Sequence, residues 1–211
     1  MASYQNWTDQ SENFDDAYSE KSTIPLFKEY VKQDLNLRQK IVFEELGDLK
    51  DKKILDLGCG VGRYSQEAAM KGAQTIGIDI SPKAIEIAKK KTLEFNLSTN
   101  CKFICDDFIN SKNIPKVDYV IALGFVQYFD DGLKVLNDIL NVNRKIIFDL
   151  PTFFHWINPC RKVYRTLMKG IKFTSYTQKE VTNLVNDLNS QYNLSLKIIK
   201  KNPTIWIISN V

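Results

Sequence analysis

A glycine-rich loop is the first place in this sequence where residue types and spacing point to chemistry. The apolar run Lys53–Gly58 continues into Cys59, Gly60, Val61 and Gly62, so that glycine recurs at every second position. Because glycine has no Cβ, it allows a tight turn and lets a ligand approach the backbone closely. The loop lacks the Gly-Lys-Ser/Thr sequence of a phosphate-binding loop, which argues against ATP as the ligand.

Acidic residues end the next two apolar runs. The run Gln74–Ile80 ends in Asp79 and Ile80, about 20 residues after the first glycine, where a carboxylate accepts hydrogen bonds from ribose hydroxyls. The run Cys101–Asp107 ends in two aspartates and is followed by Phe108. A carboxylate at this position can hydrogen-bond to the edge of an adenine, and an apolar neighbour such as Phe108 can pack against the adenine ring. The pattern predicts a nucleoside site.

The elements that must position these residues alternate along the chain. Apolar spacing predicts one or two helices before Gly47 and further helices at 65–72, from Ser81-Pro82 to 95, at 131–140 and at 177–188. It predicts seven strands at 53–58, 74–80, 101–107, 117–124, 144–150, 194–200 and 204–210. Strands that alternate with helices favour a parallel sheet covered by helices. The last two strands are separated by too few residues for a parallel crossover and must pair antiparallel.

The predicted fold is therefore α/β, a doubly wound, seven-stranded, mostly parallel sheet with a terminal antiparallel hairpin. We expect a single domain over residues 1–211. Within it, 1–50 form a helical cap, 51–150 the ligand-binding core, 151–176 an insert, and 177–211 the closing helix and hairpin.

The motifs resemble those of the class I S-adenosylmethionine-dependent methyltransferases of the small-molecule type. ILDLGCGVGRYS is similar to their first motif, GIDIS to their second-strand acidic motif, CDDF to their adenine-contacting segment, and VDYVIALGFVQYF to their fourth-strand motif. The resemblance extends from about Lys53 to Leu150 and implies a Rossmann-like methyltransferase fold. A nicotinamide dehydrogenase is the nearest rival. The G-x-G-x-G spacing, which differs from the dinucleotide fingerprint G-x-G-x-x-G, and the closing hairpin argue against it.

The resemblance also implies roles for single residues toward S-adenosylmethionine and its product S-adenosylhomocysteine. Gly58, Cys59 and Gly60 would flank the methionine part, and Asp79 would bind the ribose. Asp107 with Phe108, or Asp106, would contact the adenine. Leu123 would lie near the transferred methyl group. The cofactor-binding set is completed by Asp56, which lies in the first motif, by Ile80, which follows Asp79 in the second, and by Tyr18, from a segment similar to one that lies over the cofactor.

His155 is the candidate general base, because it is the only histidine in the chain and follows the fifth predicted strand. An imidazole with a pKa near 6.5 is suited to that role, although a surface histidine beside Trp156 explains the residue equally well. Tyr128 and Tyr164 are weaker catalytic candidates. In the catechol-type members of the family, acids at the ends of the fourth and fifth strands hold a metal. The fourth predicted strand here ends in Leu123-Gly124 without an acid, so the resemblance implies no metal.

The insert 151–176 carries a concentrated positive charge. It contains no acidic residue and five basic ones, Arg161, Lys162, Arg165, Lys169 and Lys172, in a chain whose net charge is +4. This composition is explained equally well in two ways. The insert forms a solvated cationic face, or it contacts an anionic methyl acceptor. The stretch 158–169 has the spacing of an amphipathic helix, and a peripheral contact with an anionic membrane is a further alternative.

These patterns predict a methyltransferase that acts on oxygen or nitrogen of a small, anionic metabolite such as a sugar, amino acid or lipid precursor. The alternatives are a tRNA or protein methyltransferase and a non-catalytic S-adenosylmethionine-binding module. The mild net charge argues against nucleic acid as the default partner. With no apolar stretch of about 20 residues and no secretory signal at the N-terminus, we expect a cytoplasmic protein with free thiols.

Overall fold

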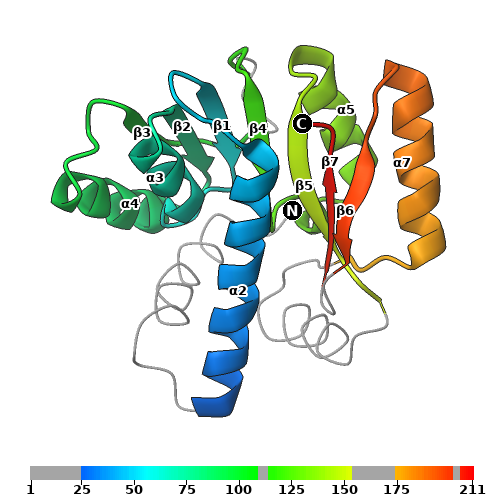
Figure 1. Ribbon diagram of the computed structural model, residues 1–211, viewed down its shortest axis with the longest axis horizontal. Helices are drawn as coiled ribbons and strands as arrows, with labels where there is room; N and C mark the ends of the chain where they lie inside the picture. The colour runs from blue at the N-terminus through cyan, green and yellow to red at the C-terminus, as the bar shows by residue number, and fades with distance from the viewer. Residues whose placement is uncertain (1–24, 109–113, 154–173, 202–204) are drawn as a thin grey trace. The chain divides into compact units, whose positions relative to one another are not determined.

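The computed structural model of the protein describes residues 25–108, 114–153, 174–201 and 205–211. It contains seven strands: β1 (Lys53–Leu57), β2 (Gln74–Asp79), β3 (Cys101–Cys105), β4 (Tyr119–Ala122), β5 (Ile146–Pro151), β6 (Lys197–Lys201) and β7 (Ile205–Ser209). They form a mixed sheet in the order β3-β2-β1-β4-β5-β7-β6 (Figure 1). The prediction of a seven-stranded, mostly parallel α/β sheet with a closing antiparallel hairpin is confirmed.

The chain divides into two compact units, and the first spans Tyr4–Phe108. Its helices are α2 (Pro25–Leu46), α3 (Arg63–Met70) and α4 (Pro82–Glu94). Strands β1, β2 and β3 are parallel, with Leu57 opposite Ile78 and Asp79 opposite Cys105. This register brings the carboxyl ends of all three strands to one edge, where the predicted nucleoside site begins.

Local signals account for the start of α4 and the end of α2. Ser81 caps α4, because its hydroxyl accepts a hydrogen bond from the Ala84 N–H at 3.3 Å and Pro82 follows at the first helical position. Helix α2 ends before Gly47, which has a left-handed φ of +66°. Both ends agree with the predicted ones.

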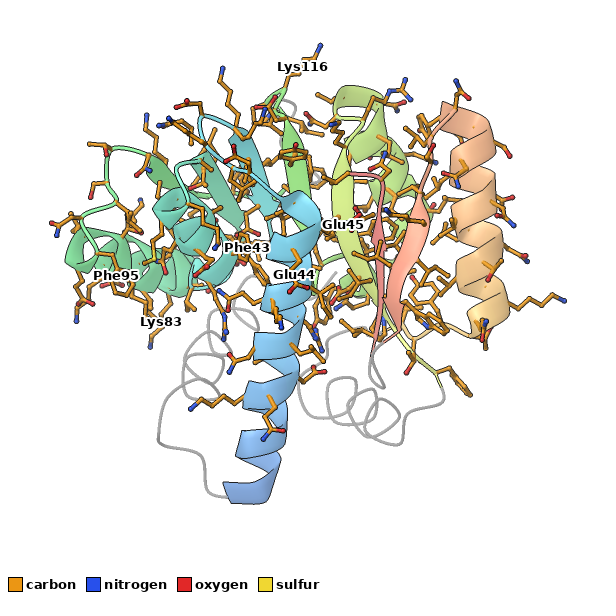
Figure 2. The ribbon with its side chains drawn as sticks, in the orientation of Figure 1. Phe43, Glu44, Glu45, Lys83, Phe95 and Lys116 are labelled. Carbon is orange, nitrogen blue, oxygen red and sulfur yellow. The ribbon has the colours of Figure 1, made fainter. Side chains whose placement is uncertain are left out.

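Helix α2 is tied to the beginning of α3 by side chains that the sequence alone does not pair. The Arg63 guanidinium donates hydrogen bonds to Gln39 at 2.5 Å and to Asn36 at 2.6 Å. Phe43 lies near the end of α2 (Figure 2). The centroid of its ring is 6.2 Å from that of Tyr64. Contacts with α2 therefore hold the first turn of α3, which follows the glycine-rich loop.

The second unit contains the rest of the described chain, including the helices α5 (Gly132–Val142), α7 (Gln178–Tyr192) and the short 3-10 helix η1 (Val126–Tyr128). Strand β5 is parallel to β4 and antiparallel to β7, which also pairs with β6. The predicted capping box of α7 is present: the Thr177 hydroxyl accepts from the Glu180 N–H, and the Glu180 carboxylate accepts from the Thr177 N–H.

Candidate cofactor site

The glycine loop after β1 is a turn built on left-handed backbone. Gly58, Gly60 and Gly62 have φ values of +68°, +53° and +83°, which only glycine adopts without strain. The Gly58 and Cys59 N–H groups both donate to the Ile78 carbonyl, at 2.8 and 3.1 Å. The loop is thus attached to the end of β2, and its alternating glycines are required by the backbone.

Asp79, at the end of β2, connects this loop to α4. One carboxylate oxygen accepts from the Gly60 N–H at 2.8 Å and the other from the Ser81 N–H at 2.8 Å. Burial raises the pKa of Asp79, and these two hydrogen bonds counteract part of the rise. A carboxylate has about four acceptor positions, so Asp79 retains capacity for the two hydroxyls of a ribose.

Open space lies beside Gly60. A Cβ at Gly60 would have no heavy atom of the described residues within 4 Å. The equivalent atom at Gly62 would lie 2.5 Å from the Phe103 ring. Among the described residues the loop is therefore tightly packed at Gly62 but open at Gly60, whose N–H donates to the Asp79 carboxylate.

The adenine segment follows β3 at the same edge. The Asp106 N–H donates to the Asp79 carbonyl at 3.0 Å, and the Asp107 N–H donates to the Asp106 carboxylate at 2.8 Å. Asp106 is exposed, Asp107 is half-buried and Phe108 is buried. Ile80, which is half-buried, follows Asp79. These predicted residues thus all lie where β1, β2 and β3 end.

Asp56 has a different place from the other predicted residues. It is 2% exposed, and its Oδ2 atom accepts from the Ser65 hydroxyl at 2.7 Å and from the Ser65 N–H at 3.2 Å. Asp56 therefore holds the first turn of α3 beneath the glycine loop. Burial raises the pKa of Asp56 to about 7, although the hydrogen bonds from Ser65 lower it.

This raised pKa predicts a pH-dependent stability. An aspartate that binds its proton more tightly in the folded state stabilises fully below about pH 3.8 and loses that contribution as the pH rises through about 7. We expect Asp56→Asn to become more stable than the wild type with increasing pH, by up to about 4 kcal/mol. Urea unfolding of both proteins from pH 4 to 8 measures the difference. A difference that does not change with pH would contradict the raised pKa.

Cys59 is a packing residue of the loop and not a nucleophile. The residue is 7% exposed and belongs to a buried cluster with Cys101 and Phe103. Burial raises the pKa of the Cys59 thiol well above its ordinary value, and the nearby Asp56 and Asp79 raise it further. A thiol that stays protonated is a poor nucleophile.

The remaining predicted residues lie elsewhere in the chain. Leu123 is half-buried after β4, and Tyr128 is half-buried in η1, both in the second unit. Tyr18 and His155, and with them Tyr164 and most of the insert, lie outside the described residues. Their roles stay predictions.

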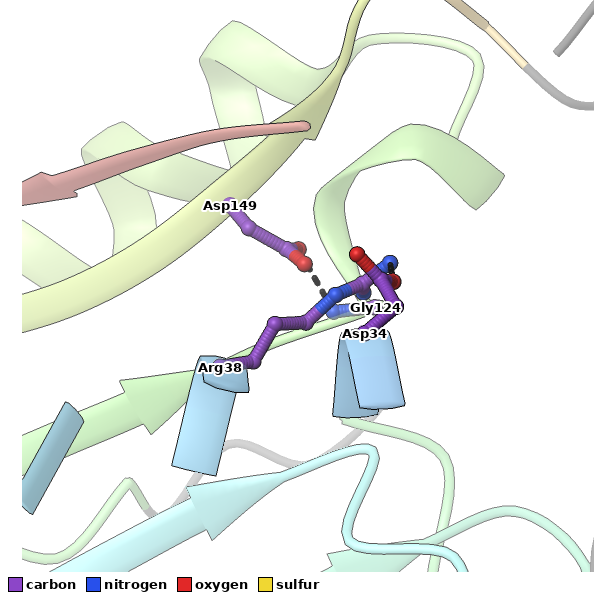
Figure 3. Close-up of polar contacts among 4 residues, drawn as sticks. All are labelled: Asp34, Arg38, Gly124 and Asp149. Carbon is purple, nitrogen blue, oxygen red and sulfur yellow. Dashed lines mark hydrogen bonds and ion pairs between the residues drawn. The ribbon is translucent and has the colours of Figure 1, made fainter. Parts of the chain in front are cut away.

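The second unit contains a buried acid that the sequence-based site did not include. Asp149 on β5 is 0% exposed, and its Oδ1 atom accepts from the Gly124 N–H at 2.6 Å. Figure 3 shows this contact and, in the first unit, the ion pair of Arg38 with Asp34 at 2.6 Å. An aspartate inside the apolar run of β5 was the available signal, because a buried carboxylate requires hydrogen bonds.

Two further properties of the described residues bear on the site. No group of three or more His, Cys, Asp and Glu side chains among them is arranged to hold a metal ion. None of the helices in the described part of the chain is long and apolar enough to cross a membrane.

Comparison with known proteins gives relatives of this chain. A ubiquinone biosynthesis O-methyltransferase of Actinobacillus pleuropneumoniae is 27% identical over 141 residues, which are 65% of this chain and 59% of that protein. A protein of Methanobrevibacter smithii named "Probable cobalt-precorrin-6B C(15)-methyltransferase (decarboxylating)" is 32% identical over 96 residues, 45% of this chain and 51% of the relative. The chain thus spans between half and three fifths of the length of these two curated relatives.

A solved structure agrees in fold over nearly the whole chain. The magnesium protoporphyrin IX methyltransferase of Synechocystis, crystallised with S-adenosylhomocysteine, has a TM-score of 0.75 at 18% identity and covers 99% of this chain and 100% of its own. The family model described as "Methyltransferase domain" matches residues 48–208. The protein therefore belongs to the family of S-adenosylmethionine-dependent methyltransferases.

Proposed function

We propose that this protein transfers the methyl group of S-adenosylmethionine to oxygen or nitrogen of a small, anionic molecule, without a metal. The observation that carries the proposal is the position of the Asp79 carboxylate. It fixes the Gly60 N–H of the glycine loop and the Ser81 N–H of α4, and it keeps acceptor capacity beside the open space at Gly60.

The residues at this edge contact different parts of the cofactor. Asp79 binds the ribose, the segment Asp106–Phe108 receives the adenine, and the loop around Gly60 receives the methionine part. When bound, S-adenosylmethionine supplies a methyl group activated by its sulfonium. The protein then has to position the methyl acceptor and, where that molecule carries a proton, to remove it. His155 and Tyr128 are the proposed groups for that proton.

The chemistry of the methyl acceptor is supported by the relatives and by charge. One similar protein is named as an O-methyltransferase of ubiquinone biosynthesis, and another as a methyltransferase of magnesium protoporphyrin IX. Ubiquinone and magnesium protoporphyrin IX are both small molecules. The five basic residues of 151–176 supply positive charge for a carboxylate or phosphate on such a molecule. We therefore favour a small molecule over tRNA or protein.

Calorimetry with S-adenosylhomocysteine tests the proposal. We expect a single site with a Kd on the order of micromolar, and no binding of NAD or ATP under the same conditions. Absence of heat with S-adenosylhomocysteine would overturn the proposal. Binding without transfer of label from tritiated S-adenosylmethionine to any small molecule, tRNA or protein would instead favour a non-catalytic module.

A further inference from the structure

Strand β3 is an outermost strand of the sheet, and among the described residues it pairs with β2 alone. The Thr75 N–H donates to the Asn100 carbonyl at 2.8 Å, and the Asp106 N–H donates to the Asp79 carbonyl at 3.0 Å. Because successive backbone groups of a strand point to opposite sides, every second residue from Asn100 to Asp106 bonds toward β2. Phe103, in the middle of β3, directs its N–H and carbonyl to the outer side. Such a side is a template for pairing with a further strand.

The other outermost strand, β6, is protected against pairing of this kind. Three of its five residues, Lys197–Lys201, are lysines, and its register with β7 shifts between Ile198 and Lys200. Lysines and irregular pairing on an outermost strand hinder its association with a further strand. Strand β3 has the sequence CKFIC, with a single lysine, and a regular register with β2. The sheet therefore lacks this protection at β3.

The side chains of β3 divide into a buried and an exposed face. Phe103 is buried in a cluster with residues of α4. Lys102 and Ile104 point to the opposite face, where Lys102 is exposed and Ile104 is 46% exposed. Asp106 continues this alternation, because its N–H still bonds to β2, and it is exposed as well. The open face of β3 thus presents a cation, an apolar side chain and an anion at every second position.

This row of side chains is complementary to itself. When two β3 strands pair antiparallel about a two-fold axis at Phe103, the two Phe103 residues exchange their N–H and carbonyl bonds. Lys102 then lies opposite Ile104 of the partner subunit and diagonal to Asp106 of the partner subunit, within reach of a lysine side chain. The right-handed twist of paired strands shortens this diagonal and lengthens the one between the two Lys102 side chains. The axis repeats each contact, so the pair gains two ion pairs and covers both exposed isoleucines.

Helix α4 adds apolar surface beside this strand. It packs against β3 on the buried face, and at its C-terminal end Leu93 is 67% exposed and Phe95 is 51% exposed. Figure 2 shows Phe95 at the end of the unit that β3 and α4 form. A two-fold axis perpendicular to the sheet keeps the α4 helices of both copies on the same face of the joined sheet. Apolar surface next to the strands favours a stable contact, because two paired strands alone bury little area.

From these observations we infer that two copies of this protein form a dimer by pairing their β3 strands antiparallel about Phe103, so that one sheet continues through both. A second copy fits this side because its charges are complementary, and the two-fold interface closes with two copies. The pairing places Lys102 of the partner subunit beside Asp106, whose carboxylate accepts from the Asp107 N–H at 2.8 Å. Each copy thus contributes a side chain to the segment of the other that is proposed to receive the adenine. The inference goes beyond the proposed function and does not depend on it.

Analytical ultracentrifugation of the full chain without ligand tests the association. Over about 1 to 100 μM protein, the average mass should rise from that of one chain toward that of two. Lys102→Glu sets a carboxylate diagonal to Asp106 of the partner subunit, and we expect it to raise the dissociation constant at least about tenfold. Lys102→Arg keeps the charge and should dimerise as the wild type does. High salt should weaken the wild-type dimer, because its ion pairs lie at the surface.

Lys197→Glu is the matched control, because it makes the same change of charge at an exposed position of β6, the other outermost strand. It should dimerise as the wild type does. A wild type that stays monomeric over the whole range of concentration, or a dimer that Lys102→Glu leaves unchanged, would overturn the inference. Since Lys102 is exposed, circular dichroism should show the wild-type fold in the Lys102→Glu variant.

Cross-linking tests the register of the two strands. In a Cys105→Ser background, which removes the exposed thiol of β3, Lys102→Cys and Ile104→Cys are prepared as separate variants. The two positions are directly opposite in the proposed pair, at a Cα distance of about 4.5 Å, which a disulfide spans. Mild oxidation of the mixture should therefore give a covalent dimer, and either variant alone should give less, because its thiols are diagonal. A mixture that cross-links no better than either variant alone would overturn the pairing about Phe103, and the inference with it.

Discussion

Replacement of Asp79 by alanine is expected to lower the affinity for S-adenosylhomocysteine by at least about 100-fold. A hydrogen bond to a charged group is worth about 1.5–3 kcal/mol, and the proposed contact with a ribose contains two of them. The carboxylate also accepts a hydrogen bond from the Gly60 N–H at 2.8 Å, so its loss disturbs the loop proposed to receive the methionine part. Calorimetry on the folded variant measures the effect.

Two variants separate ribose binding from a general loss of structure. Asp79→Asn keeps the shape and one acceptor oxygen but loses the charge, so we expect an affinity between those of the wild type and the alanine variant. Asp138→Asn changes an exposed aspartate of α5 in the other unit and should bind as the wild type does. If Asp79→Ala binds S-adenosylhomocysteine normally, Asp79 is not the ribose ligand.

The sequence alone predicted those features of the fold that depend on residues close to one another in the chain. Ser81 with Pro82 marks the start of α4, and Thr177 with Glu180 marks that of α7, because a cap needs only a side chain and the first turn. The alternation of strands and helices predicted the parallel sheet for a similar reason, since a strand and the following helix form one local unit.

Contacts between distant residues were not predicted. The strand order puts β7 between β5 and β6, an arrangement that depends on pairing partners about 60 residues apart in sequence, such as Ile147 and Ser209. Likewise, nothing local shows that Ser65 is the partner of Asp56, or that Gly124 donates to Asp149. Asp79, Asp106 and Asp107 were found because a strand ending can be recognised in the sequence. The groups that hydrogen-bond to Asp56 and Asp149 belong to other elements and could not be found in that way.

The glycine loop illustrates the same limit and gives the second large prediction. Its three glycines look equivalent in the sequence, but only the structure distinguishes Gly62. An L-residue at the left-handed φ of +83° costs about 1–2 kcal/mol. A Cβ there would also lie 2.5 and 2.8 Å from two atoms of the buried Phe103 ring, and overpacking of a core costs about 1–3 kcal/mol more. Gly62→Ala should therefore lose about 2–5 kcal/mol of unfolding free energy in urea.

Gly60→Ala is the matched control, because its φ of +53° carries the backbone strain without any clash with the described residues. It should lose only about 1–2 kcal/mol, while its methyl group occupies the space proposed for the cofactor and weakens S-adenosylhomocysteine binding. The two alanines should thus give opposite signatures, one mainly in stability and the other mainly in affinity. If Phe103→Leu largely suppresses the cost of Gly62→Ala in a double-mutant cycle, the ring contact is its source. Equal losses of stability in the two variants would show that backbone strain alone, and not the contact with Phe103, causes the loss at Gly62.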